Sequence, residues 1–217
     1  MPAPRRPRLC FVGPLAGVRP GYVVTQAVRH FAHFAAAGWP VLAVSTRRNR
    51  YARLADVGWT LWRRRRDIDV LILEVYAGMS FVIEDLASRL GSGARVPIVM
   101  VMHGGAFPEF AARYPIWARR VLGRASVIVA PSSYLARTVR SMGLSCRVIP
   151  NVIDLDEYPF RERGHPRPTL LWMRSFHDVY NPAMAIHVIE RLRAAYPDAR
   201  LIMAGQDKGT MAGTMDL

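Results

Sequence analysis

Short apolar runs recur along the whole chain, and amphipathic stretches separate them. This alternation is typical of βαβ units, in which parallel strands form one sheet and helices cover its faces. Strands are expected near 8–13, 40–45, 69–75, 96–102, 126–130 and 146–149. The clearest helices are expected at 22–37, 79–90, 110–122 and 132–142. The pattern therefore predicts an α/β fold with a doubly wound, Rossmann-like parallel sheet.

The pattern lapses at "YPFRERGHPRP", residues 158–168, and then restarts. Proline, arginine and glycine dominate this stretch, which is typical of an interdomain linker. A strand at "TLLWM", a helix from about Pro182 to Tyr196 and a strand at "ARLIMAG" are expected after it. We therefore expect a first domain over 1–157, a linker over 158–168 and a second domain over 169–217. The second domain is expected to be incomplete, because about fifty residues are fewer than half of a usual domain.

The chain has 217 residues, and 51% of them are hydrophobic, which is enough to fill a core. No apolar stretch approaches the ~18 residues that span a bilayer. Gly13, Pro14 and Gly17 interrupt the apolar start before a signal-peptide core can form. Cys10 and Cys146 fall in expected strands, which predicts reduced thiols and a cytoplasmic protein.

The charge is strongly positive, with 30 Lys and Arg residues against 16 Asp and Glu residues and a formal net charge of +14. Such a surface favours phosphate-rich partners: nucleic acid, anionic lipid or a diphosphate ligand. Composition alone does not choose among these three.

The stretch "VMHGGAFPEF" ends an apolar strand abruptly with a histidine and two glycines. Ligands of open α/β sheets collect beyond the carboxyl ends of the strands, which is where His103, Gly104 and Gly105 would stand. Glycine there permits close backbone approach or a positive φ. The alternative is a plain strand-to-helix turn in which His103 only hydrogen-bonds the chain, and both interpretations stay open.

The turn after the first strand, "GPLAGVRPG", carries Gly13, Gly17 and Gly21. It is not the G-x-G-x-x-G fingerprint, so a dinucleotide site is disfavoured. Its N–H groups and Arg19 could still hold an anion at a helix N-terminus, and a flexible turn is the equal alternative.

Two Asp-x-Asp pairs resemble those that hold a metal in some sugar-nucleotide enzymes. They are "DID" at 67–69 and "DLD" at 154–156. We favour structural roles for both pairs, because one begins a strand and the other lies in a turn where aspartates commonly cap. No metal site is expected.

The run "WTLWRRRR" places two tryptophans beside four consecutive arginines. Tryptophan at headgroup depth and arginine on anionic lipid would make a peripheral membrane patch. The residues of this patch would be Trp59, Trp62, Arg63, Arg64, Arg65 and Arg66. The slightly favoured alternative is a solvated helix end whose tryptophans pack inward.

Several segments together resemble family-4 glycosyltransferases of the GT-B fold, in an order that spans nearly the whole chain. "PSSYLARTVRSMGLSCRVIPNVID", residues 131–154, resembles the end of their first domain. "LLWMRSF" and "AMAIHVIERLRAAYPDARLIMAGQDKG" resemble the opening of their second domain. The "HGG" segment and the glycine-rich first turn sit where that family places its cleft loops.

The resemblance implies transfer of a sugar from a nucleotide diphosphate sugar to a sugar or lipid-linked acceptor, with retention and without a metal or other cofactor. It makes 1–157 the acceptor-side domain and 169–217 the start of the donor-binding domain. It places His103 over the donor sugar as the catalytic residue. It assigns donor binding to Gly21, Gly104, Gly105 and Arg174. Arg174 also has a physical warrant, since a guanidinium is permanently charged and fits phosphate oxygens bidentately.

The chain departs from the family pattern in three ways. Tyr180, Asn181 and Pro182 stand where the family has a lysine-glycine pair, and the first turn lacks an adjacent glycine pair. The chain also ends at Leu217, before the region of the family's two donor-engaging glutamates. We therefore expect either a piece of a longer gene product or a degenerate member that does not turn over.

The competing interpretation is a non-catalytic basic module that binds anionic lipid or nucleic acid through its arginines. No nucleic-acid reading motif and no aromatic-basic platform occurs in the sequence, so nucleic acid is not expected as a partner. We expect a cytoplasmic protein that attaches to the inner membrane face only if the tryptophan–arginine run docks there.

Overall fold

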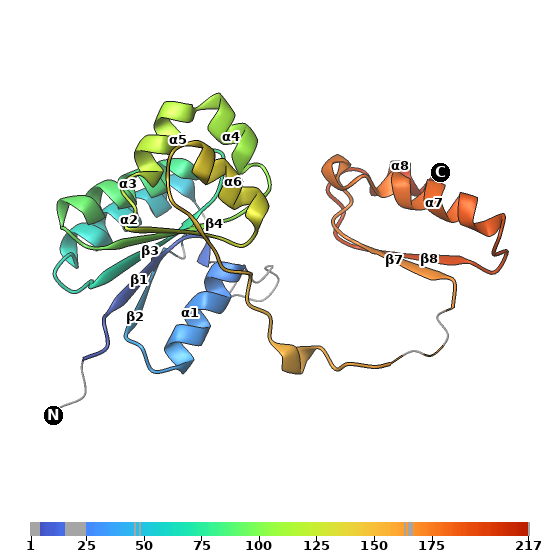
Figure 1. Ribbon diagram of the computed structural model, residues 1–217, viewed down its shortest axis with the longest axis horizontal. Helices are drawn as coiled ribbons and strands as arrows, with labels where there is room; N and C mark the ends of the chain where they lie inside the picture. Colours follow the sequence, from blue (N-terminus) through green and yellow to red (C-terminus); the bar gives the residue numbers. More distant parts are fainter. Residues whose placement is uncertain are drawn as a thin grey trace. The chain divides into compact units, whose positions relative to one another are not determined.

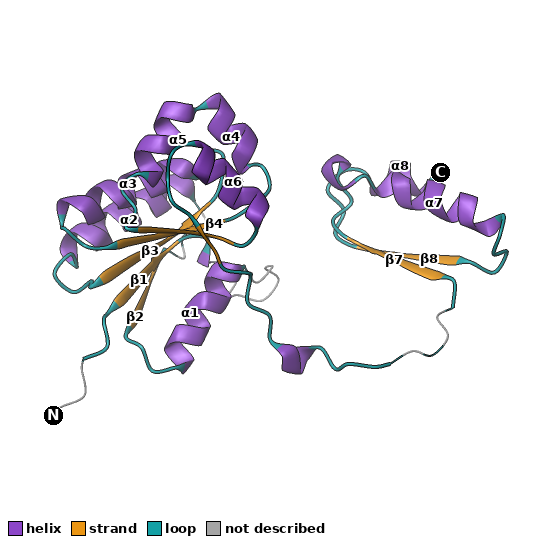
Figure 2. Cartoon of the chain, viewed as in Figure 1, coloured by secondary structure: helices purple, strands orange, loops and turns teal. Residues whose placement is uncertain are grey.

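The computed structural model describes residues 5–15, 25–45, 47, 49–162, 164 and 167–216. Two compact units divide the chain, Met1–Asp154 and Leu155–Leu217. Figures 1 and 2 show the elements of each unit. The acceptor-side and donor-binding roles expected for the two parts of the chain stay predictions.

The first unit is built on a parallel sheet of six strands in the order β2-β1-β3-β4-β5-β6. Its strands are β1 (Leu9–Val12), β2 (Val41–Val44), β3 (Val70–Val75), β4 (Ile98–Met102), β5 (Val127–Ala130) and β6 (Arg147–Val148). Each lies within a predicted strand, so the predicted α/β fold with a doubly wound parallel sheet is confirmed. The strand order reverses between β1 and β3, and their carboxyl ends therefore form a topological switch point.

Helices cover both faces of this sheet (Figure 1). They are α1 (Gln26–Ala36), α2 (Arg50–Arg63), α3 (Phe81–Gly93), α4 (Phe107–Arg113), α5 (Pro115–Leu122) and α6 (Ser133–Ser141). The larger core lies between the sheet and α2 to α6, with Leu73, Met100 and Phe107 fully buried in it. A smaller core around Phe11 and Ala27 lies under α1 on the opposite face.

The single helix expected at 110–122 is wrong, because the structure has two helices there, α4 and α5. Tyr114 separates them with φ −130° and ψ 57°, which is not helical. Pro115 explains the break, since it has no N–H for a helical bond and disfavours helical backbone in the residue before it.

The favoured expectation that the tryptophans of "WTLWRRRR" pack inward is also wrong. Helix α2 ends at Arg63 and buries Val57 and Leu61, which lie four residues apart on one face. Trp59 and Trp62 fall outside that face and are 60% and 53% exposed. Their rings lie 5.5 Å apart, centroid to centroid, and contact each other at the surface.

The second unit contains one βαβ arrangement. Its elements are the 3₁₀ helix η2 (Leu155–Glu157), β7 (Thr169–Met173), the 3₁₀ helix η3 (Asp178–Tyr180), α7 (Pro182–Arg193), β8 (Arg200–Ala204) and α8 (Met211–Met215). Strands β7 and β8 pair in parallel and form a sheet of their own. Asn181 caps α7 in a left-handed conformation, φ 45°, and its side chain accepts a hydrogen bond from the N–H of Met184.

Within the described ranges, every helix is too short or too polar to cross a bilayer. Cys10 and Cys146 are both buried, and neither forms a disulfide.

Candidate functional site

The switch point of the first unit gathers the residues that follow β1, β3 and β4. Gly13 comes directly after β1, Tyr76 directly after β3 and His103 directly after β4. Parallel strands place these positions at one edge of the sheet, where ligands of this class of fold bind.

Glu74, the only charged residue of β3, is fully buried in an otherwise apolar strand. One carboxylate oxygen bonds to Nε2 of His103, and the other lies 3.2 Å from Nδ1 of His30 on α1. Burial by itself would raise the pKa of Glu74, but the hydrogen bonds from His103 and His30 outweigh it and hold that pKa below its ordinary value. Glu74 is therefore an ionised carboxylate that accepts from both imidazoles.

An ionised carboxylate only accepts hydrogen bonds, so the His103 nitrogen that faces it carries a proton. This fixes the orientation of the ring, with Nε2 committed to Glu74. The ring also stacks on Tyr76, with centroids 4.9 Å apart and an interplanar angle of 17°. The backbone N–H of His103 donates to the carbonyl of Val75 at 2.8 Å. His103 is thus a buried, oriented group, and its contact with a donor sugar stays a prediction.

The glycines around this histidine differ in whether the structure requires glycine at their positions. Gly104 has φ +76°, a conformation that favours glycine, whereas a Cβ on Gly105 would meet no atom within 4 Å. A Cβ on Gly13 would lie 2.7 Å from Cβ of Glu74, so the close approach of β1 to Glu74 requires glycine there. Gly21, also predicted to bind the donor, lies outside the described residues.

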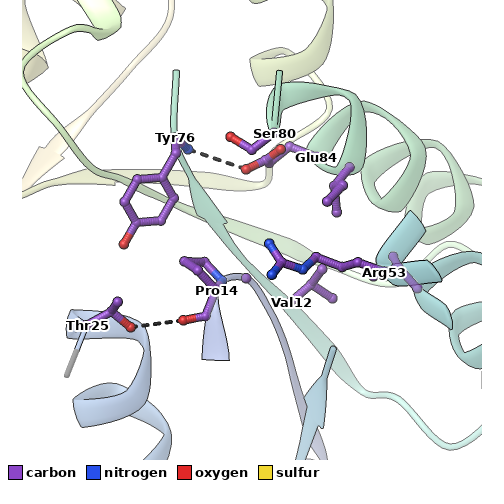
Figure 3. A pocket seen from close by; sticks show the side chains of 10 residues that line it. Val12, Pro14, Thr25, Arg53, Tyr76, Ser80 and Glu84 are labelled. Carbon is purple, nitrogen blue, oxygen red and sulfur yellow. Dashed lines mark hydrogen bonds between the residues drawn. The ribbon is translucent and has the colours of Figure 1, made fainter. Parts of the chain in front are cut away.

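A cavity of about 370 Å³ opens beside this cluster (Figure 3). Its lining comes from β1 and the turn after it, the N-cap of α1, α2, the residue after β3 and the start of α3. The lining residues are Val12, Gly13, Pro14, Thr25, Arg53, Val57, Tyr76, Ser80, Ile83 and Glu84. Tyr76 belongs both to this wall and to the stack on His103, so the cavity and the His103–Glu74 pair adjoin.

Glu84 is the second buried carboxyl group of the site, 5% exposed on α3. Its Oε1 accepts from the N–H of Tyr76 at 3.3 Å, and its Oε2 has no hydrogen-bond partner among the described residues. Burial raises the pKa of Glu84 to about 8, against the smaller opposing effects of backbone hydrogen bonds and the charge of Arg53. Burial together with the charges of Glu74 and Glu84 raises the pKa of Tyr76 to about 12. Both side chains are therefore mainly protonated at pH 7.

Arg174 follows β7 in the second unit and is exposed. Its N–H donates to the carbonyl of Ala204 at 3.1 Å, and its guanidinium lies 5.1 Å from the ring centroid of Tyr180. A Cβ on Gly205 would lie 1.6 Å from the carbonyl oxygen of Arg174, so this crossing of two chain segments requires glycine. Tyr180, which departs from the family pattern, supports the side chain expected to hold phosphate.

The two aspartate pairs lie in different surroundings. Asp69 and Asp67 accept hydrogen bonds from the guanidinium of Arg8 at 3.0–3.1 Å. Hydrogen bonds from Arg8 lower the pKa of Asp69 to about 2. Asp156 lies in η2. No group of three or more His, Cys, Asp or Glu side chains that could hold a metal occurs in the described part of the chain.

Sequence reasoning missed Glu74, His30, Tyr76, Arg53 and Glu84. A signal existed for Glu74, because a lone carboxylate inside the apolar run "VLILEV" requires a buried partner. Arg53 and Glu84 carry no such signal, since charged residues are ordinary on amphipathic helices.

Comparison with known proteins bears on the family. The family described as Glycosyltransferase Family 4 matches residues 19–157 of this chain. No curated protein sequence matches this chain significantly.

Solved structures with similar folds include an α-glucosyltransferase in complex with UDP and a 13-mer DNA containing a central A:G mismatch. It shares 12% identity at a TM-score of 0.58, over 97% of this chain and 59% of the other. An α-glucosyltransferase in complex with UDP-glucose and DNA containing an abasic site shares 15% identity at a TM-score of 0.59, and the match covers 97% of this chain and 60% of the other. A putative UDP-N-acetylglucosamine 2-epimerase from Listeria monocytogenes shares 9% identity at a TM-score of 0.54, and the match covers 96% of this chain and 65% of the other. The chain thus spans about three fifths of the length of these proteins, and the likeness establishes the fold.

Proposed function

The chain belongs to glycosyltransferase family 4, and we propose that it acts in the transfer of a sugar from a nucleotide diphosphate sugar to an acceptor hydroxyl. The observation that carries the proposal is the buried Glu74–His103 pair beside a cavity at the switch point, inside the region that matches the family. Two of the similar structures hold UDP or UDP-glucose, which supports a nucleotide sugar as donor.

In the proposed reaction the acceptor oxygen bonds to the anomeric carbon of the sugar while the bond from that carbon to the diphosphate breaks. The nucleotide diphosphate leaves with the bonding electrons, and the hydroxyl proton passes to a phosphate oxygen. We propose that the new bond forms with retention and without a metal, as the family resemblance implies. The chemistry then consists of positioning and of stabilising the charge of the leaving group.

Arg174 and His103 would divide this work. The guanidinium of Arg174 is permanently charged and lies over the ring of Tyr180. It would form hydrogen bonds and ion pairs with the diphosphate oxygens. Glu74 would act as a positioning residue, because it holds the imidazole of His103 in one orientation at the strand end. Gly21, Gly104 and Gly105 would admit the donor close to the backbone.

Calorimetric titration of UDP into the wild type and two variants tests these roles. Arg174→Ala should weaken UDP binding about ten- to hundredfold, because it removes a charged contact worth ~1.5–3 kcal/mol. His103→Ala should leave UDP affinity nearly unchanged and slow sugar release from UDP-glucose. Arg191→Ala, which removes an exposed arginine from the last turn of α7, is the matched control. Equal UDP affinity in Arg174→Ala and wild type would contradict the donor site and favour the basic-module alternative.

We propose in addition that the protein attaches to anionic membrane surfaces through the end of α2. The exposed Trp59 and Trp62 support this role, together with the four arginines that follow them. Each basic residue near such a surface contributes ~1 kcal/mol, and the attraction weakens as salt shortens the screening length.

Vesicle sedimentation tests the membrane proposal. Replacing Arg63, Arg64, Arg65 and Arg66 with glutamine should abolish salt-sensitive binding to anionic vesicles. Replacing four exposed arginines elsewhere with glutamine should reduce it much less, and suitable positions are Arg113, Arg137, Arg161 and Arg167. Equal losses in the two quadruple variants would show only general charge attraction and would contradict a docking patch.

A further inference from the structure

The cavity at the switch point contains an arginine whose charge no described side chain neutralises. Arg53 lies on α2, and its Nε donates to the carbonyl of Arg47 at 3.0 Å, which anchors the guanidinium. Its two terminal nitrogens make no hydrogen bond and no ion pair with any residue that the structure describes. Figure 3 shows the guanidinium between Val12, Pro14 and Glu84. An anchored guanidinium with free N–H groups is suited to bind a planar or tetrahedral anion.

Glu84 lies close enough to Arg53 for the arginine charge to lower its pKa, but the two side chains form no salt bridge. Because burial keeps the Glu84 carboxyl mainly protonated at pH 7, this group does not cancel the charge of Arg53. A protonated carboxyl is also a hydrogen-bond donor. Its unpartnered oxygen is buried in the cavity wall, so a ligand atom could complete its hydrogen bonding.

The rest of the wall is mostly apolar. Val12, Pro14, Val57 and Ile83 line it together with the ring of Tyr76. A volume of about 370 Å³ lies in the range of small-molecule pockets, which typically combine apolar walls with a few placed polar groups. The cavity therefore has space for an apolar body and one charged end.

We propose that this pocket binds an acceptor carrying a phosphate or carboxylate group on an apolar body, with the anion on Arg53 and an oxygen of the ligand on Glu84. Calling the ligand the acceptor rests on the proposed function, whereas the anion site rests on the pocket alone. Tyr76 connects the pocket to the ring of His103, which places such a ligand beside the residue assigned to transfer.

Three probes of similar size test the chemistry of the pocket by calorimetry: phenyl phosphate, benzoate and benzyl alcohol. We expect at least one of the two anions to bind at least tenfold more tightly than benzyl alcohol, and the stronger of the two identifies the anionic group. Arg53→Gln should weaken that binding tenfold or more, as the loss of a charged hydrogen bond of ~1.5–3 kcal/mol requires. Arg50→Gln, three residues earlier on α2 and outside the wall, should leave it unchanged.

Methyl NMR locates the probe independently of stability. The resonances of Val12, Val57 and Ile83 should shift on titration in the wild type and should shift much less in Arg53→Gln. Equal affinity for all three probes, equal binding by the Arg53 and Arg50 variants, or shifts confined to other methyl groups would each overturn the proposal.

The two proposals fail separately. If UDP binds through Arg174 while neither anionic probe binds, the pocket assignment is wrong and the donor proposal stands. If phenyl phosphate binds through Arg53 while UDP does not bind, the anion site is supported and the glycosyl-transfer proposal loses its donor.

Discussion

The two units of the chain bury their sheets to different degrees. In the first unit, five of the six residues of β3 are buried, and helices lie on both faces of the sheet. In the second unit, β7 and β8 contain no buried residue, and Leu171, Met173 and Ile202 are 54–70% exposed. Strands of parallel sheets are normally covered on both faces, and here one βαβ arrangement supplies cover for only one. The comparison shows that apolar strands alone do not bury a sheet, because burial also requires helices on both of its faces.

The same contrast governs the ionisable groups. The buried Glu74, Glu84 and Asp85 all belong to the first unit, where deep packing orients them and shifts their pKa values. Arg174 of the second unit is exposed and contacts Tyr180 at the surface. The first unit therefore holds its buried carboxylates in fixed orientations, whereas the guanidinium of Arg174 in the second unit is exposed.

The largest expected effect comes from disrupting the second unit where Gly205 crosses Arg174. Gly205→Ala would place a Cβ 1.6 Å from the carbonyl oxygen of Arg174, so β7 and β8 must separate at their ends. We expect a loss of about 3 kcal/mol or more in local stability. Amide hydrogen exchange should show lost protection in β7 and β8 and unchanged protection in β3.

Gly213→Ala is the matched control, since a Cβ there would meet no atom within 4 Å. If Gly205→Ala exchanges as slowly as this control, the crossing is looser than the structure shows. The comparison between a well-buried first sheet and an exposed second sheet would then weaken.

A smaller effect is expected from the polar cluster of the first unit. Asp85 accepts hydrogen bonds from Arg124 at 2.7 Å, Trp117 at 2.8 Å and Arg89 at 2.9 Å. Burial by itself would raise its pKa, but the bonds from Arg89, Arg124 and Trp117 outweigh it and hold the pKa well below the ordinary range. Asp85→Asn should reduce the free energy of unfolding by about 2–4 kcal/mol at pH 7, because it leaves the arginines unpaired.

The depressed pKa sets the direction of the acid dependence. Stabilisation by Asp85 is present above the ordinary carboxyl pKa and is lost as the pH falls through the lowered value. Denaturant unfolding at pH 7 and at pH 3 should therefore show a smaller difference between variant and wild type at pH 3. Asp56→Asn on α2 is the control, and an equal loss in both variants would contradict a special role for Asp85.

Glu84→Gln should act in the opposite pH direction. The folded-state pKa of about 8 is raised, so the stability contributed by Glu84 is complete below the unfolded value and is lost as the pH rises through 8. Glutamine does not ionise. Between pH 6 and pH 9 the free energy of unfolding of the variant should therefore rise, relative to that of the wild type, by on the order of 1–2 kcal/mol. Unfolding curves with parallel pH dependence in variant and wild type would show that Glu84 is not buried as described.

The smallest effect concerns the loop after β4. Gly104→Ala should cost about 1 kcal/mol, because alanine is disfavoured at φ +76°. Gly105→Ala should be nearly neutral, since the site of its Cβ is open. Thermal unfolding of both variants measures the difference, and equal midpoints would mean that the loop relaxes at no cost.

Some elements of the fold are predictable from the sequence, and others are not. Apolar runs predicted β1 to β5, because a parallel strand covered on both faces must be apolar along its length. The edge strand β6 was also predicted, although its two residues, Arg147 and Val148, are exposed. Pro115 carried the information that divides α4 from α5, although the apolar periodicity continues across it. The exposure of Trp59 and Trp62 was not predictable from hydrophobicity, because the face of α2 that packs inward is chosen by its neighbours.

The sequence by itself determined the α/β fold, the strand ends and the place of His103, Gly104 and Gly105 at one of them. These features follow from local periodicity and from residues whose backbone preferences act within a few positions. Only the tertiary structure decided that Glu74 holds His103, that Arg53 and Glu84 share one cavity, and that Arg174 crosses Gly205. The reason is that these contacts join residues about thirty positions apart, and their distances depend on strand order and on the packing of helices against the sheet.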